Sequence, residues 1–459
     1  MRPRLQQARD QLPTLLRRRP GAKAGELAAL AGVSQPTLSR MLKEAAGQVV
    51  ALGRGPRRRY YGRRTLRGLA GSFPVYAVDT AGRATQVATL ELVQPEGTVL
   101  DVAAMGWPVE EEFRDGHWPG LPYPLQDMRP QGFLGRSFAR QVAADLGVSD
   151  NPRDWSDDDV LYILTQRGAD TAGNLIVGDA ALQRWLASKG EAPPLIAEAE
   201  IVPAYARRAD QASALGAVGS SAAGEFPKFT AWRALAGSAT PHVIVKFSGA
   251  DATGTVRRWA DLLCCEHLAL EQARRLPGVP SARSRLLQVQ GRTMLEAERF
   301  DRHGLYGRSA LCSLETIDAA MLARASDDWS AIAATLREQG WITEDTQRQI
   351  RLVWAYGRLI GNTDMHKGNL SFVPGLPMRM APVYDMLPMM YAPLGGGELP
   401  RTRYAPVLPA PRDRELWLQA AAAAAAFWDS AAQDERISAE FRALCADNGQ
   451  TLTRLAAMA

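Results

Sequence analysis

The spacing of hydrophobic residues at the start of the chain predicts short helices joined by a tight turn. Apolar residues recur every three or four positions over residues 8–20 and again over Leu27–Leu30, which is the period of an amphipathic helix. Gly32 then makes a turn, and Ser34 caps a further helix that carries Pro36 in its first turn, where proline is tolerated. This succession is typical of a helix-turn-helix.

A strongly basic hairpin is predicted directly after these helices. Val49–Leu52 reads as one strand, and Arg59–Tyr61 reads as the returning strand. In a helix-turn-helix the start of the second helix faces base edges, while a basic hairpin lies along phosphates. Residues 1–66 therefore predict a winged helix-turn-helix that binds DNA, although a run of arginines alone would indicate only a solvated face. The expected DNA-binding residues are Gln35, Thr37, Ser39, Arg40, Arg57, Arg58 and Arg59.

The next part of the chain, residues 67–205, alternates strand-like runs with proline-rich loops. Strands are predicted over residues 74–79 and 87–93, and a helix is predicted from Asp157 onward. The aspartates between 154 and 159 fit the solvated start of a helix, where acidic side chains favour the helix dipole. The sequence shows neither a metal cluster nor a nucleophile arrangement here, so we expect an α+β structural module.

Composition narrows the class of protein only slightly. Hydrophobic residues make up 46% and charged residues 22%, as in ordinary globular proteins, and a net charge of +5 permits a polyanionic partner. Four cysteines without CxxC spacing favour a reducing compartment, the cytoplasm. No run reaches the about 18 apolar residues of a membrane helix, so a membrane partner is not expected.

Three stretches from residue 216 onward carry the candidate chemistry. The first is rich in glycine, and the second contains a lysine within an apolar strand. Residues 216–229 are rich in glycine and serine, which lets the backbone approach phosphates. Lys246 interrupts an apolar strand, where it needs an anionic partner unless it reaches water at the strand end. Glu266 on the next predicted helix is placed to orient Lys246 by an ion pair, as in protein kinases.

The third stretch, residues 359–388, has the spacing of a phosphotransfer loop. Asn369 lies five positions after Asp364, the offset found in the catalytic loop of protein kinases, and Asp385 follows sixteen positions later. In that loop the aspartate accepts a hydroxyl proton, while the asparagine and a further aspartate bind magnesium. His366 could orient the loop, or could be a structural histidine. The order of these stretches predicts a phosphotransferase that uses ATP and Mg²⁺.

These residues resemble the HipA family of bacterial toxin kinases over roughly residues 135–390. The resemblance is carried by Ser221–Gly224 with Lys228, the IVKFSG strand, AERFDR at 297–302, GNTDMHKGNLSF and APVYDMLP. The fused N-terminal segment and DMRPQGFLGR at 127–136 are similar to the HipH (YjjJ) branch of the family. Where the standard toxin has a Gln-Glu-Lys run after the loop glycine, this chain has Glu225-Phe-Pro-Lys228.

The resemblance implies an α+β, two-lobed protein-kinase-like fold with an N-lobe over 206–300 and a mainly helical C-lobe over 301–459. It implies Asp364 as catalytic base, Asn369 and Asp385 as magnesium ligands, and Lys246 as a catalytic residue that contacts the ATP phosphates. His366, in the loop of Asp364, is the third candidate catalytic residue. Backbone atoms of Glu298 and Phe300 would meet adenine, and Asp301 the ribose. The residues implied to line the ATP site are Ser220, Ser221, Gly224, Lys246, Glu266, Glu298, Phe300 and Asp301.

The expected activity is therefore that of a serine/threonine kinase toxin that also binds DNA. The resemblance implies autophosphorylation at Ser221, with Ser220 as the neighbouring choice, and a protein substrate; family targets include aminoacyl-tRNA synthetases. It also implies an antitoxin as partner. The alternative is a DNA-binding regulator whose kinase-like part only senses a ligand and catalyses nothing.

Overall fold

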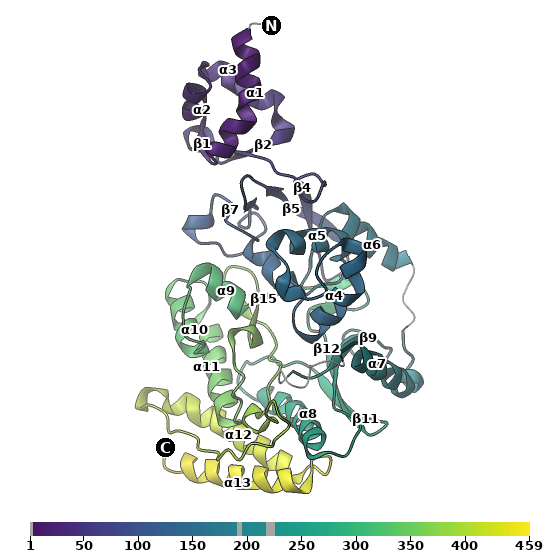
Figure 1. Cartoon of the computed structure of the whole chain (residues 1–459). Helices are drawn as coiled ribbons and strands as arrows, with labels where there is room; N and C mark the ends of the chain where they lie inside the picture. The colour runs from purple at the N-terminus through teal and green to yellow at the C-terminus, as the bar shows by residue number, and fades with distance from the viewer. Residues whose placement is uncertain (1–2, 191–194, 217–224) are drawn as a thin grey trace.

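The computed structural model describes residues 3–190, 195–216 and 225–459. In Figure 1 the chain runs from a small N-terminal domain at the top, through a middle module, to a sheet and a group of long helices at the bottom. The expected Ser220, Ser221 and Gly224 lie outside the described residues.

The N-terminal domain has the predicted helices and the two predicted hairpin strands, together with a third short strand that was not predicted. Ser34 caps the third helix by accepting a hydrogen bond from the Thr37 backbone N–H at 3.4 Å, and Gly32 has the positive φ of +62° that its turn requires. Leu12, Leu27 and other apolar residues of the helices form a buried cluster of their own. The elements are α1 (Pro3–Arg18), α2 (Ala24–Leu30), α3 (Gln35–Glu44) and a sheet ordered β1 (Ala22–Lys23), β3 (Arg59–Gly62), β2 (Val49–Leu52).

The middle module is built on a five-stranded antiparallel sheet, which confirms the predicted strands and the predicted helix. The strand order is β7 (His117–Trp118), β6 (Thr98–Val99), β5 (Ala84–Leu92), β4 (Ser72–Val78), β8 (Leu175–Val177). Its helices are α4 (Gly132–Leu146), α5 (Asp157–Arg167) and α6 (Asp179–Gly190).

The predicted acidic start of α5 is confirmed and Asp154 is exposed, but Asp157, Asp158 and Asp159 are half-buried and paired rather than simply solvated. Arg64 donates two hydrogen bonds of 2.6 and 2.7 Å to Asp158, and Arg67 forms an ion pair with Asp159. Arg129 binds Asp157 at 2.5 Å. Each of the three aspartates thus joins α5 to another segment, and two of these pairs fasten the segment that follows the basic hairpin to the middle module.

The second half opens with a four-stranded antiparallel sheet ordered β11 (Ser284–Val289), β12 (Arg292–Glu298), β10 (His242–Phe247), β9 (Lys228–Trp232). Helix α8 (Gly254–Ala273) packs on this sheet, and so does α7 (Ile201–Gly216). Tyr205 of α7 is fully buried in one cluster with Phe229 and Val243 of the sheet. The boundary expected between 205 and 206 therefore falls inside a helix that packs against this sheet.

The remainder of the chain is mainly helical, as predicted. Its alanine-rich stretch forms part of α12, where small side chains such as Ala421 and Ala424 are buried against neighbouring helices. The helices are α9 (Leu314–Met321), α10 (Trp329–Glu338), α11 (Glu344–Leu359), α12 (Arg414–Gln433) and α13 (Ala439–Ala456). The short strands are β13 (Arg302–His303), β14 (Gly307–Arg308), β15 (Cys312–Ser313), β16 (Ser371–Val373) and β17 (Arg379–Met380).

Across the described ranges, none of the helices has the length and apolar character needed to span a bilayer.

Candidate active site

Lys246 is the centre of a three-residue charge cluster that joins three distant parts of the chain. It lies on β10, in the interior of the four-stranded sheet, and its ammonium is 2.7 and 2.8 Å from the two carboxylate oxygens of Glu266 on α8. The same nitrogen is 2.5 Å from Oδ1 of Asp385, which is 139 positions away in sequence. Since Glu266 is only 2% exposed, the lysine has the buried anionic partner that the sequence required.

The opposite charges of Lys246 and Asp385 stabilise each other's ionised forms. Burial alone would lower the pKa of Lys246, but the carboxylates of Asp385 and Glu266 outweigh it and raise that pKa above its ordinary value. Burial raises the pKa of Glu266, whereas for Asp385 the effect of burial is outweighed by Lys246 and Lys228, which hold its pKa below the ordinary value. The site therefore keeps a cationic lysine beside an anionic aspartate.

The stretch after α11 closes on itself through two asparagines. Asn369, which is 9% exposed, donates from Nδ2 to the backbone carbonyl of Asp364 at 2.8 Å. Asn362 accepts from the Asp364 backbone N–H at 3.0 Å and donates to the carbonyl of Asp385 at 3.4 Å. The spacing of Asp364 and Asn369 thus yields one compact loop, and Asn362, which the sequence analysis missed, ties this loop to the cluster around Lys246.

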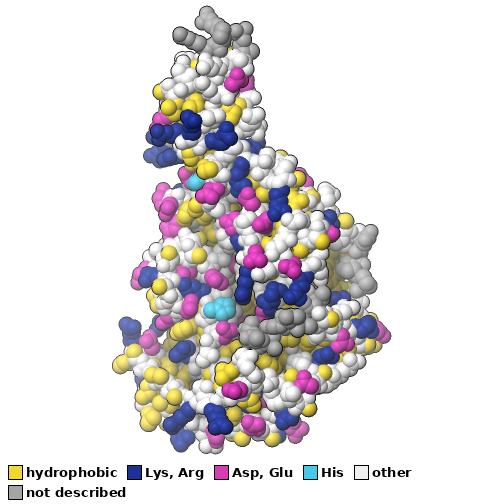
Figure 2. All heavy atoms as spheres, viewed as in Figure 1, with side chains coloured by type: hydrophobic (Ala, Val, Ile, Leu, Met, Phe, Trp, Pro, Cys, Tyr) yellow, Lys and Arg dark blue, Asp and Glu magenta, His cyan; other side chains and the backbone are white. Residues whose placement is uncertain are grey.

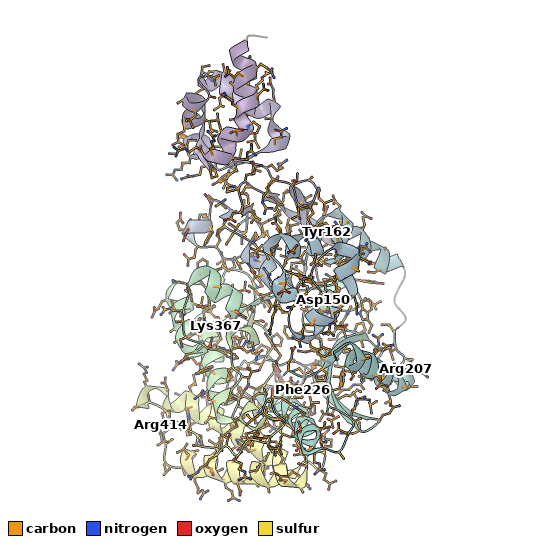
Figure 3. The ribbon with its side chains drawn as sticks, in the orientation of Figure 1. Asp150, Tyr162, Arg207, Phe226, Lys367 and Arg414 are labelled. Carbon is orange, nitrogen blue, oxygen red and sulfur yellow. The ribbon has the colours of Figure 1, made fainter. Side chains whose placement is uncertain are left out.

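The side chains along this loop point in different directions. Asp364 and His366 are exposed, and loss of hydration is the main cause that raises the pKa of Asp364. His366 accepts from the Gly368 backbone N–H at 3.1 Å, which supports the structural interpretation of this histidine. Lys367 binds Asp318 of α9 at 2.7 Å, so it fixes the loop to a neighbouring helix, and Figure 3 shows it on the side of α9 and α11.

Asp385 stands in an unusual backbone conformation beside an anchoring tyrosine. Its φ is +55°, a left-handed geometry that aspartate tolerates better than most residues and that often marks a functional position. The neighbouring Tyr384 donates to the carbonyl of Gly368 at 2.7 Å. This bond holds the segment of Asp385 against the loop of Asp364, and no local pattern in the sequence announces it.

The end of β12 was expected to meet adenine and ribose. Glu298 ends the strand, its side chain pairs with Arg233 at 3.2 Å, and the Phe300 ring lies 5.7 Å from the ring of Tyr384. The ring contact places the Phe300 side chain beside Tyr384, the residue before Asp385.

Asp301, by contrast, uses its carboxylate to bind other protein groups. It is 5% exposed, it accepts from Arg299 at 3.0 and 3.1 Å and from Arg302 at 2.7 Å, and the backbone N–H of Gly173 in the middle module donates to it at 3.0 Å. Asp170 of the same module binds Arg302 at 2.7 Å. Asp301 therefore forms part of the contact between the middle module and the second half of the chain. These bonds offer no support for the expected ribose contact.

The expected DNA-binding residues lie on the N-terminal domain, far along the chain from this site. Thr37 is half-buried, and the others are exposed: Gln35, Ser39, Arg40, Arg57, Arg58 and Arg59. Figure 2 shows basic side chains gathered on the lower part of this domain in the view. Two further arginines after the hairpin, Arg63 and Arg64, pair with Glu91 and Asp158 of the middle module, so they serve domain docking.

The donor set of the site fits magnesium only together with a nucleotide. In the described ranges there is no group of three or more His, Cys, Asp or Glu side chains that could hold a metal by themselves. Asp385 and Asn369 supply one carboxylate and one amide oxygen, and Mg²⁺ is commonly bound by one or two carboxylates with substrate phosphates completing its shell. The residues present therefore fit an ion that arrives with phosphate ligands.

The fold and the second half of the chain define a HipA-like protein. Residues 220–448 match the HipA-like C-terminal domain. A HipA of Shewanella oneidensis MR-1, solved with HipB and its operator DNA, has a TM-score of 0.50 at 13% identity and covers 84% of this chain and 96% of its own. The proinflammatory kinase CtkA of Helicobacter pylori gives a TM-score of 0.35 at 12% identity, covering 50% of this chain and 88% of its own.

Within this class the chain belongs to the YjjJ-like toxin family. Residues 69–186 match the middle domain of YjjJ-like toxins. The toxin YjjJ of Escherichia coli (strain K12) is 38% identical over 421 residues, which cover 91% of this chain and 92% of that protein.

Proposed function

We propose that this protein is an ATP-dependent serine/threonine kinase that acts as the toxin of a toxin–antitoxin-like system. One observation carries the proposal: Lys246 contacts both Glu266 and Asp385, and Asn362 joins Asp385 to the loop that carries Asp364 and Asn369. A lysine–glutamate pair beside a metal-binding aspartate and an Asp-x4-Asn loop is the arrangement that kinases use for phosphoryl transfer.

Each residue of the site has one task in this reaction. Asp364 accepts the proton of the attacking hydroxyl, and its exposure lets a protein substrate reach it. Lys246 contacts the nucleotide phosphates, while Asn369 and Asp385 hold Mg²⁺, which neutralises charge on the phosphates when bound. The backbone of Glu298 and Phe300 receives the adenine.

Autophosphorylation extends the same chemistry to the glycine-rich stretch. Ser221, or its neighbour Ser220, is the proposed acceptor, because it precedes Gly224 in the stretch that resembles the family's phosphate-binding loop. A phosphate group adds close to two negative charges at neutral pH, which repel a nucleotide phosphate and switch the kinase off.

The test of the activity is phosphate transfer by the full-length protein. The chain is incubated with γ-labelled ATP and Mg²⁺, with and without a bacterial lysate. The lysate supplies cytoplasmic proteins, including aminoacyl-tRNA synthetases, as candidate substrates of a cytoplasmic toxin. We expect label on the protein itself and on at least one lysate protein, and none when Mg²⁺ is chelated. A protein that neither binds ATP nor transfers label would refute the kinase.

A second candidate function, DNA binding, is favoured by the exposed polar start of α3 and the exposed arginines of the hairpin. The solved HipA neighbour is bound to HipB and operator DNA. Here the N-terminal domain is part of the chain itself, so we infer that it contacts DNA directly, whether or not a separate antitoxin also binds.

Replacing Arg57, Arg58 and Arg59 together with alanine should weaken DNA binding and flatten its salt dependence. Each lost phosphate contact removes about 0.9 unit from the slope of log K against log salt concentration. The measurement is fluorescence anisotropy of a labelled duplex at several salt concentrations. An unaltered slope would make these arginines ordinary solvated residues.

A charge-matched control is available at the other end of the molecule. In this control, three exposed arginines that follow the candidate active site in the chain are replaced with alanine: Arg401, Arg403 and Arg412. This triple variant should keep the wild-type slope.

The alternative to the kinase is a DNA-binding regulator with a ligand-sensing pseudokinase. It predicts that toxicity and DNA binding both survive the loss of Asp364 and Asp385.

A further inference from the structure

The run Glu225-Phe-Pro-Lys228, which departs from the standard toxin, is fastened by contacts to three neighbouring segments. The Phe226 ring lies 4.7 Å from the ring of Trp259 on α8 and 5.9 Å from the ammonium of Lys246, near the middle of Figure 3. The backbone carbonyl of Pro227 accepts from Phe247 at 3.0 Å, and Lys228 stands opposite Lys246 in the sheet. The position of this run therefore bears directly on Lys246.

Glu225 connects this run to the first turn of α4 in the middle module. Its Oε1 accepts from the Phe133 backbone N–H at 2.8 Å, its Oε2 is 3.1 Å from Nη2 of Arg136, and Lys228 lies 3.0 Å from Oε1. Although burial opposes ionisation, Lys228 and these hydrogen bonds hold the pKa of Glu225 below its ordinary value. The carboxylate is therefore a fully charged acceptor at neutral pH.

Gly132 makes room for this carboxylate. Its φ is +61°, and a Cβ at this position would lie 2.7 Å from Oε1 of Glu225. A side chain here would collide with the carboxylate oxygen, and the positive φ by itself favours glycine. Gly132, Phe133 and Arg136 all belong to the DMRPQGFLGR stretch, to which the proposed reaction gave no task.

The other end of this stretch reaches the opposite side of the site. Asp127 accepts from the backbone N–H and the hydroxyl of Ser313 at 2.6 and 2.7 Å, and from Thr316 at 2.9 Å. Ser313 caps α9, the helix whose Asp318 binds Lys367 of the catalytic loop. One short stretch thus touches both the segment beside Lys246 and the helix that supports Asp364.

We propose that residues 127–136 are a positioning element of the candidate active site, which holds Glu225 at one end and α9 at the other. This inference rests on the proposed kinase function and assigns a role to residues outside the catalytic machinery. The end at Glu225 sets the place of β9 and Lys246 and so governs nucleotide affinity. The end at Asp127 sets the catalytic loop and so governs the rate of transfer.

Substitutions at the two ends of residues 127–136 should affect different quantities, ATP affinity at one end and the rate of phosphate transfer at the other. Glu225→Ala should weaken Mg²⁺–ATP binding by about tenfold, the effect of losing a partly buried charged hydrogen-bond acceptor, with little change in the rate at saturating ATP. Asp127→Asn should slow transfer by a similar factor with the dissociation constant unchanged, because one amide oxygen cannot replace two carboxylate oxygens. Calorimetry gives the affinity, and ADP formation at saturating ATP gives the rate.

Matched variants test whether Glu225 and Arg136 act as a pair. Arg136→Ala should reduce ATP affinity, Arg136→Lys should recover part of it, and the double variant of Arg136 and Glu225 should be no weaker than Glu225→Ala. Arg140→Ala, an exposed arginine one turn further along α4, is the control and should behave as wild type. Additive losses in the double variant would overturn the pairing.

Hydrogen exchange separates this inference from the kinase proposal. In the Glu225→Ala protein the Phe133 amide loses its acceptor and should exchange faster, whatever the activity. Unchanged exchange would overturn the anchor itself, and faster exchange with wild-type ATP affinity would overturn its positioning role. A wild-type protein that binds no ATP would refute the proposed function and this role with it, while the exchange result would still report the contact.

Discussion

Asp364→Asn will reduce phosphate transfer from ATP by about a hundred- to ten-thousandfold, the usual effect of removing a general base. The variant should still bind Mg²⁺–ATP, because the hydrogen bonds that hold Asp364 in the described part of the chain run through its backbone N–H and carbonyl. The measurements are the initial rate of label transfer and the calorimetric dissociation constant for Mg²⁺–ATP.

The matched control is Asp327→Asn, which removes the same charge from an exposed position before α10. It should transfer label at the wild-type rate. Asp385→Asn should lose transfer too, but with weaker nucleotide binding, because Asp385 contacts Lys246 and is a proposed magnesium ligand. If Asp364→Asn labels as fast as wild type, another group is the base and the role given to Asp364 is wrong.

Asp301→Asn will destabilise the protein by at most about 3–5 kcal/mol, the cost of removing one partner from a buried ion pair, because Asp170 still pairs with Arg299 and Arg302. Asp301 is 5% exposed and pairs with the buried Arg302 and with the half-buried Arg299. An amide would keep one acceptor oxygen and present an NH₂ group to these arginine donors. The measurement is the free energy of unfolding from urea denaturation, with the exposed Asp150→Asn as control.

The loss should depend on pH in a defined direction. Burial would raise the pKa of Asp301, but Arg299 and Arg302 outweigh it and lower the pKa below its ordinary value of 3.8. A lowered folded pKa gives stability that is present at neutral pH and is lost as the pH falls through that pKa. The difference between wild type and Asp301→Asn should therefore be full above about pH 5 and shrink below about pH 4.

The same variant decides between the two roles considered for Asp301. If it joins the middle module to the rest of the chain, the variant loses stability, and the ATP affinity of its folded fraction stays within a few fold of wild type. If Asp301 contacts the ribose instead, the ATP affinity of the variant falls while its denaturation midpoint is unchanged. The second result would restore the role implied by the family resemblance.

Sequence alone determined the local parts of this protein. Helical periodicity, the Ser34 cap and the alanine-rich stretch predicted helices that the structure confirms, because these signals act over a few residues. The offset between Asp364 and Asn369 likewise predicted a loop, which the structure shows closed by a hydrogen bond from the Asn369 side chain to the Asp364 carbonyl.

Tertiary structure alone decided which distant charges meet. Lys246 and Asp385 are 139 positions apart, Arg136 and Glu225 are 89 apart, and Gly173 and Asp301 are 128 apart. An arginine or aspartate has the same local preferences whether it faces water, DNA or a buried partner. Its neighbours are chosen only when sheets and helices pack, which is why the contacts of Asp301 and of residues 127–136 could not be predicted from the sequence.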